Sequence, residues 1–198
     1  MENKFFTLIK PALNYIDKGN FFRQPFSWLY TIIAVLSLLV PFYLLYQAID
    51  SNIFKAPAKF IIVFILIWFV IAFVSWLSFQ LWWDRKSKVS KTTEEGEEFI
   101  ATPVFSHLIQ TFGECLGMWV GIVGFAFALI ATIILGSEGA YLARTLGMGF
   151  LSTGAANIIL MPIYGFLIIV FFRFTAEIFR ALTSIANTAK KQIKFFEK

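Results

Sequence analysis

The sequence predicts an all-α integral membrane protein with four transmembrane helices arranged as two helical hairpins. Two observations lead to this fold class. Hydrophobic residues make up 59% of the 198 residues and charged residues only 15%, which is outside the usual range of soluble domains. Four long stretches also lack charge, and each is long enough to cross the roughly 30 Å hydrocarbon core of a bilayer. The 25 phenylalanines and six tryptophans fit this class, because aromatic rings partition into hydrocarbon and collect at the headgroups.

The first hairpin is expected over residues 26–83. It follows an N-terminal interfacial segment, residues 1–25, in which apolar residues recur at helical spacing between charges, as in a helix lying in the membrane plane. Residues 26–49 and 60–83 carry no charge and form the two spans. Pro41 is expected to kink the first of them, because it removes a backbone donor.

The second span ends in a sequence typical of a membrane exit, where Trp82 and Trp83 are followed by Arg85 and Lys86. A charged linker, residues 84–98, comes next. Its charges are so dense that it has no apolar face to bury, which predicts a solvated loop.

The second half of the chain repeats this outline. An interfacial helix is expected at residues 99–114, the second transmembrane hairpin at 115–172 and a cytoplasmic amphipathic helix at 173–198. Within this hairpin, Thr145–Asn157 is rich in Gly, Ser and Thr. Composition leaves open whether this stretch is helical, broken or re-entrant.

The basic residues predict the orientation of the chain. Fourteen of the seventeen Lys and Arg residues lie before the first span, between the second and third spans, or after the fourth. By the positive-inside rule, both termini and the linker at 84–98 are expected in the cytoplasm, with the chain in a bacterial inner membrane. The net charge of +5 therefore indicates orientation and contact with membrane lipid, and no nucleic-acid partner is predicted.

A glycine-rich face on the third span is the predicted site of helix packing. Gly113, Gly117 and Gly121 are spaced four apart, and Gly124 follows three residues later, so all four share one face of a helix. Small residues on one face allow another helix to approach closely. The leading hypothesis is therefore a non-catalytic membrane subunit, with an accessory, assembly or scaffold role. It would pack through this face against other integral membrane proteins or itself.

Two other functions remain open. A small homo-oligomeric channel or carrier would use Asn157 to line a path and Glu114 at its mouth, because polar and ionisable groups within membranes often mark such paths. The spans carry few other polar groups, which favours the subunit hypothesis. A lipid-handling or membrane-shaping protein is the third hypothesis, suggested by the two interfacial helices and the aromatic excess.

The C-terminal helix provides a second predicted contact. Arg173, Glu177 and Arg180 are spaced four and three residues apart and lie on one face, where Glu177 is expected to pair with both arginines. The opposite, apolar stripe would dock a partner, fold back on the protein or rest on lipid.

This stretch also resembles a family of small bacterial multi-span membrane proteins known only as a domain of unknown function. In that family the spans end in an arginine, a glutamate four residues later, and a run similar to Ile-Ala-Asn-Thr. The matching residues are Arg173, Glu177 and Ile185–Thr188, within about 16 of 198 residues. The resemblance implies a membrane location and no particular chemistry.

No enzyme activity, metal site or cofactor is predicted. The sequence lacks the Gly-x-x-x-x-Gly-Lys, His-Glu-x-x-His, Cys-x-x-Cys and Gly-x-Ser-x-Gly signatures of common phosphate, metal and acyl-transfer sites. His107, the only histidine, lies outside the expected spans. Cys115, the only cysteine, is expected to be a small packing residue.

Overall fold

The computed structural model describes residue 10 and residues 20–90, 101–148 and 150–196. In these parts the chain is helical with short connections and contains no strand. Four helices are long and apolar enough to cross a membrane: Gln24–Asp50, Ala58–Val89, Ala101–Ile134 and Ala155–Lys190. The predicted all-α class and the number of membrane-length helices are therefore confirmed, and the chain is a multi-pass membrane protein. Most of the predicted N-terminal interfacial segment lies outside the described residues, and its last residues, 20–25, begin the first long helix.

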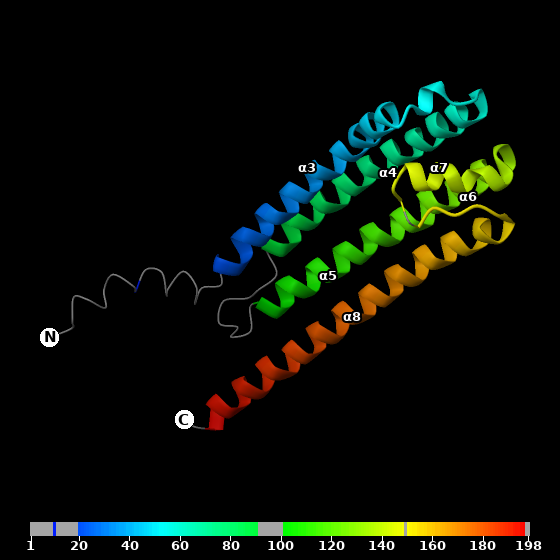
Figure 1. Ribbon diagram of the computed structural model, residues 1–198. Coiled ribbons are helices and arrows are strands. Elements are labelled where there is room, and N and C mark those ends of the chain that lie inside the picture. The colour runs from blue at the N-terminus through cyan, green and yellow to red at the C-terminus, as the bar shows by residue number, and fades with distance from the viewer. Residues whose placement is uncertain (1–9, 11–19, 91–100, 149, 197–198) are drawn as a thin grey trace.

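The first two long helices pack side by side in opposite directions (Figure 1). Helix α3 (Asn20–Asp50) continues through Pro41, and α4 (Ala58–Ser90) returns after a turn of 3-10 helix, η1 (Ile53–Lys55). The indole nitrogen of Trp68 on α4 donates to the Pro41 carbonyl at 2.8 Å, which links the two helices. Helix α4 also extends to Ser90, so the first residues of the predicted linker are helical.

The third long helix combines three elements that follow one another directly. Helix α5 (Ala101–Met118) leads into a π-helical turn, η2 (Trp119–Val123), and then into α6 (Gly124–Ile134). The interfacial helix expected at 99–114 is therefore not a separate element where the structure describes it. Its polar residues do not interrupt a helix, and the π turn lets the helix pass through the glycine-rich stretch.

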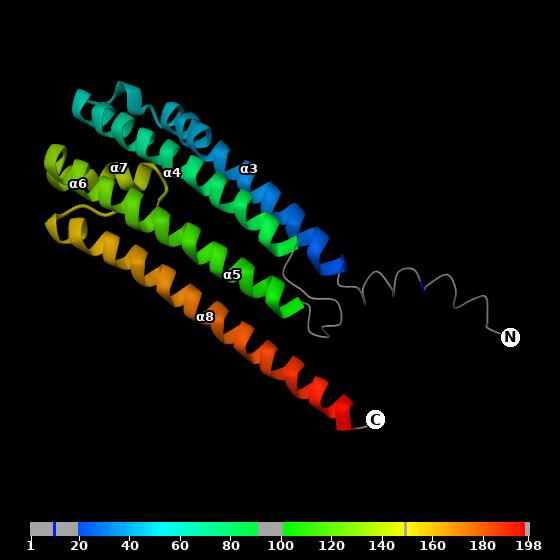
Figure 2. The same cartoon turned by 180° about the vertical axis from the view of Figure 1, so that it is seen from behind.

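Helix α8 (Ala155–Phe196) is a single helix of 42 residues. It includes both the predicted fourth span and most of the C-terminal helix expected at 173–198. No Gly or Pro occurs in its sequence after Gly165, so nothing breaks the helix where the sequence becomes polar. Figure 2 shows α8 from behind as one straight rod beside α5 and α6.

The stretch whose conformation the composition left open, Thr145–Asn157, begins at the last residue of a short helix, continues as an irregular connection and ends in the first turn of α8. Helix η3 (Gly136–Glu138) and helix α7 (Gly139–Thr145) fold back beside α6, and α8 begins only at Ala155. Gly147 and Gly154 in the connection have positive φ angles of 66° and 111°, which residues with a side chain rarely adopt. Helix α7 buries Leu142 and Ala143, so this segment closes one end of the bundle.

Two groups of buried residues form the core. The larger lies toward the α7 end, and the smaller, at the opposite end, includes Tyr30, Trp82 and Val104.

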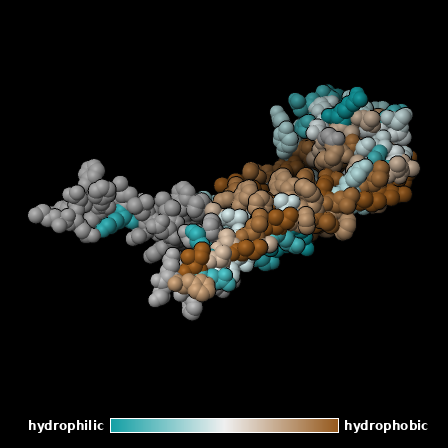
Figure 3. Space-filling model, turned by 90° about the horizontal axis from the view of Figure 1, so that it is seen from below, coloured by the Kyte–Doolittle hydropathy of each residue, from teal (hydrophilic) through white to brown (hydrophobic). Residues whose placement is uncertain are grey.

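The outer surface of the long helices is also largely apolar. Figure 3 shows hydrophobic residues over much of the middle of the molecule and a group of hydrophilic residues at one end. This distribution fits a bundle whose sides contact lipid.

The glycine face of the third helix is in contact with α8. A Cβ atom added to Gly113 would lie 2.0 Å from Cβ of Phe172, and one added to Gly117 would lie 2.5 Å from the Gly165 carbonyl oxygen. A Cβ on Gly165 would in turn meet the Gly121 Cα at 2.6 Å. The helix that approaches this face is thus α8 of the same chain. This face is filled within the protein, and a partner protein would have to bind elsewhere.

Replacement of Gly117 by Ala is expected to destabilise the bundle by about 1–3 kcal/mol, because the added methyl group would collide with the α8 backbone. Gly121→Ala is the matched control, since its Cβ would lie 3.6 Å from the Gly165 Cα, an ordinary contact. Denaturant unfolding in detergent measures the difference. Equal loss of stability in the two variants would contradict the close contact described here.

Candidate functional site

Glu114 on α5 is the centre of a charged cluster that joins three helices. Its Oε2 atom accepts a hydrogen bond of 2.9 Å from Nη2 of Arg85, which lies on α4. Its Oε1 atom accepts bonds from Nε and Nη2 of Arg173 on α8, at 2.9 and 2.8 Å. The Glu114 side chain is only 9% exposed. A carboxylate this buried needs compensating charge, and the two arginines provide it.

A glutamine extends the cluster to a third arginine. The amide nitrogen of Gln110 donates to Oε1 of Glu114 at 2.8 Å, and the amide oxygen accepts a bond from Arg180. The Nε atom of Arg180 is buried and has no hydrogen-bond partner among the described residues. Three guanidinium groups thus surround one carboxylate, and the cluster has a net positive charge.

The lengths of α6 and α8 predict that the cluster lies at one boundary of the membrane. Helix α6 ends at Ile134, 20 residues after Glu114, and α8 begins at Ala155, 18 residues before Arg173. At about 1.5 Å per residue these lengths are about 30 and 27 Å, which is close to the thickness of the hydrocarbon core. From these lengths we expect the residues of α8 that follow Arg173 to lie outside the hydrocarbon.

Aromatic and hydroxyl side chains pack at the same level as the cluster. The rings of Tyr30 and Trp82 meet edge to face with centroids 5.0 Å apart. The Tyr30 hydroxyl hydrogen-bonds the Thr111 hydroxyl at 3.3 Å, which ties α3 to α5. All four long helices are thus connected at this end of the bundle.

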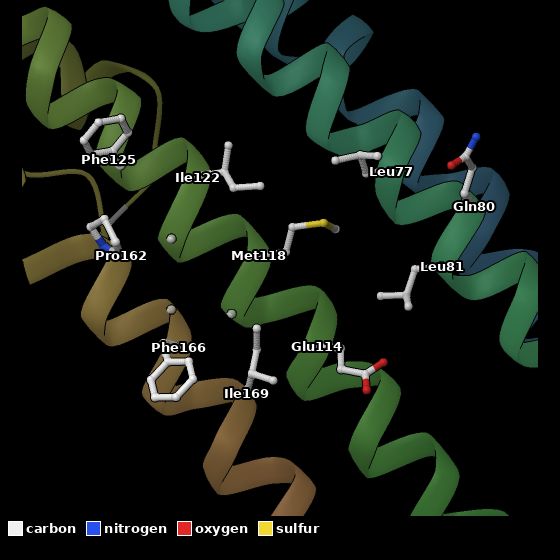
Figure 4. A pocket seen from close by; sticks show the side chains of 13 residues that line it. Leu77, Gln80, Leu81, Glu114, Met118, Ile122, Phe125, Pro162, Phe166 and Ile169 are labelled. Carbon is white, nitrogen blue, oxygen red and sulfur yellow. The ribbon is translucent and has the colours of Figure 1, made fainter.

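A groove beside the cluster runs between α4 and α8, with α5 and α6 as its floor (Figure 4). Its volume is about 860 Å³. Glu114 lies at one end of the groove, and Phe125 and Pro162 lie at the other. The lining residues are Leu77, Gln80, Leu81, Glu114, Gly117, Met118, Gly121, Ile122, Phe125, Pro162, Gly165, Phe166 and Ile169. Apart from Gln80 and Glu114, they present only apolar side chains or none.

The structure does not bring together the two residues expected to line a polar path. Asn157 lies in the first turn of α8, 16 residues before Arg173, which is about 24 Å along the helix axis from the cluster that contains Glu114. Its amide nitrogen donates to the Ser152 hydroxyl at 3.1 Å and to the Thr153 carbonyl at 2.6 Å. These short-range bonds fix the turn into the helix, a common role for asparagine.

The ion pairs expected within the C-terminal helix differ from those observed. In the described part of the chain, Arg173 pairs with Glu114 and Arg180 with Gln110, and no ion pair joins either arginine to Glu177. Glu177 is exposed. Spacing within one helix identified charges on a shared face, but the arginines reach across to α5 because a buried carboxylate attracts them more strongly than an exposed one.

Arg85 is a residue of the site that the sequence did not predict. One signal was present: a lone carboxylate in an apolar helix requires a cation at the same membrane depth, and Arg85 directly follows an aromatic belt. The choice among the basic residues depends on which helices are neighbours, which sequence spacing does not show.

Cys115 lies in a small polar contact within the bundle. Its sulfur is 3.6 Å from the Ser78 hydroxyl, which also accepts a 2.9 Å bond from the Trp119 indole nitrogen. Ser78 itself donates to the Val74 carbonyl at 2.8 Å. The cysteine is half-buried, as a packing residue would be.

Among the described residues, no group of three or more His, Cys, Asp or Glu side chains is placed to hold a metal ion. Comparison with family models, curated proteins and solved structures finds no match to this chain. The resemblance to the family of unknown function stays a prediction. The function is therefore argued from the geometry of the cluster, the groove and the exposed surfaces.

The Arg85–Glu114 pair is expected to show a coupling free energy of about 1–3 kcal/mol in a double-mutant cycle with Arg85→Gln and Glu114→Gln, because both side chains are largely buried. Lys59 and Glu138, which pair at 2.6 Å with side chains 41% and 52% exposed, provide the control. Their coupling should be below about 1 kcal/mol. Unfolding in detergent measures both cycles, and similar values for the two pairs would show that the cluster does not stabilise the bundle.

Proposed function

We propose that this protein is a non-catalytic membrane subunit that packs against a partner integral membrane protein through the outward side of α8. The observation that carries the proposal is a stripe of exposed apolar residues beyond Arg173, defined here as the outer stripe: Phe174, Ile178, Leu182 and Ile185. Their exposed fractions are 61%, 43%, 58% and 67%. Spacings of four, four and three residues place them on one side of the helix.

The outer stripe lies where lipid does not cover it. Helix α8 continues in a straight line past the charged cluster (Figures 1 and 2). We therefore expect its end to project from the membrane and not to lie in the membrane plane. Exposure of large apolar side chains to water is unfavourable by about 25 cal/mol per Å². A contiguous exposed patch of this kind is typical of a surface that another protein covers.

The polar side of the same helix is already occupied. Arg173 and Arg180 bond to α5, and Thr183 and Asn187 are buried. Several polar residues of this part of α8 thus face the bundle, while the outer stripe lies exposed beside the polar residues Glu177 and Ser184. The exposed apolar stripe supports a partner on the outward side.

The remaining parts of the proposal follow from the charge distribution. We place the end with the charged cluster in the cytoplasm of a bacterium, because the basic residues concentrate there. An accessory or scaffold role fits the groove lining better than a channel or carrier does, since a channel would need polar groups through the full depth of the membrane. The lining supplies only Gln80 and Glu114.

The test is the composition of the complex extracted in a mild detergent from cells that express the protein at its natural level. We expect another membrane protein to co-purify at fixed stoichiometry. The double variant Ile178→Ser/Leu182→Ser should lose that partner by at least tenfold while it keeps the unfolding temperature of the wild type.

The matched control is Ile32→Ser/Leu36→Ser on α3. These residues have the same types and spacing and similar exposure, 52% and 54%, but lie on another helix. Unchanged partner recovery in the α8 variant would refute a contact through the outer stripe. A pure homo-oligomer in the wild type would favour the channel or carrier alternative.

A further inference from the structure

We infer that the groove between α4 and α8 binds one anionic phospholipid from the adjoining leaflet, with the phosphate at Arg85 and Arg173 and the acyl chains along α5 and α6. This inference concerns a different surface from the outer stripe and does not depend on the partner proposed for it. Three features of the groove carry it: the charge at its mouth, its length and its volume.

The charge at the mouth suits a phosphate. Leu81 and Ile169 line the groove from opposite sides. Arg85 and Arg173 each follow one turn later on the same helices, so both guanidinium groups lie just beyond the apolar lining. The Arg173 side chain is 53% exposed although it contacts Glu114. A guanidinium group has five N–H donors, and Arg173 directs those on Nε and Nη2 to Glu114, which leaves donors for a phosphate oxygen.

Carboxylates near the mouth would repel an anionic headgroup, but the guanidinium groups there are more numerous. Glu114 is shared between two arginines, and Glu177 lies exposed one turn beyond Arg173. Three guanidinium groups lie near these two carboxylates, because Arg180 also joins the cluster through Gln110. The net charge at this end of the groove is therefore positive, which favours an anionic headgroup over a zwitterionic one.

The length of the groove corresponds to one leaflet. From Glu114 to Phe125 the floor extends over 11 residues, or about 16 Å along the helix axis. This is about half of the 30 Å hydrocarbon core. The groove thus runs from the membrane boundary to the midplane, the depth that the acyl chains of one leaflet occupy. A transmembrane helix of a partner would need to follow the full depth.

The volume is compatible with this occupant. The groove holds about 860 Å³, enough for acyl chains to lie in it while the rest of the lipid stays outside. Small-molecule sites are typically about 300–1,000 Å³. Gly117 and Gly121 lie in the floor of the groove, and Leu77 and Phe166 form its walls.

Native mass spectrometry tests the inference on the full-length protein in mild detergent, with equal amounts of phosphatidylglycerol and phosphatidylcholine that carry identical acyl chains. We expect the wild type to retain one phosphatidylglycerol at least fivefold more often than phosphatidylcholine. Arg173→Gln should abolish this preference. Leu77→Trp, which fills the groove and leaves the charges in place, should reduce retention of both lipids. Lys59→Gln, at the opposite end of α4, should change nothing.

Glu114→Gln separates lipid binding from a purely structural effect of the cluster. It removes the carboxylate that competes with the phosphate, so phosphatidylglycerol retention should equal or exceed that of the wild type. If Arg173→Gln and Glu114→Gln weakened retention alike, the arginines would serve only to pair with Glu114, and the inference would be wrong. Equal retention of the two lipids by the wild type would overturn it, as would a co-purified protein segment cross-linked into the groove.

Discussion

The pairing of Glu114 with Arg85 and Arg173 is the constraint on which the arrangement of the helices depends. Charged groups are excluded from hydrocarbon, so a buried carboxylate and its two arginines must meet at one depth near the membrane boundary. Because the three residues lie on α5, α4 and α8, the pairing fixes how these helices are aligned along the membrane normal. Tyr30 joins α3 to the same level through Thr111. One polar layer therefore sets the register of an otherwise apolar bundle.

Close backbone contact then sets the lateral spacing. The glycines of α5 and Gly165 of α8 bring these two helices together without intervening side chains. Helix α4 has no such contact with α8, so an open space remains between them over α5 and α6, and this space is the groove. The lipid that we propose would occupy this space.

The two surfaces proposed to be functional follow from this geometry. The arginines on α8 turn toward α5 to reach Glu114 and Gln110, which rotates the helix so that Ile178 and Leu182 face outward. The outer stripe and the proposed lipid-binding end of the groove therefore both depend on how α8 is oriented toward α5. We propose that a partner protein contacts the outer stripe outside the hydrocarbon. A lipid headgroup would bind the end of the groove at the edge of the hydrocarbon.

The sequence by itself determined the membrane class, the all-α fold and the four membrane-length helices, because these depend on composition and on the length of uncharged stretches. It also identified the close-packing face at Gly113 and Gly117. The sequence did not indicate that α8 fills this face, that Arg85 pairs with Glu114, or that residues 101–114 continue into the third long helix. These outcomes depend on which helices become neighbours. Only the tertiary structure decides that, since helical periodicity shows which residues share a face and not what the face meets.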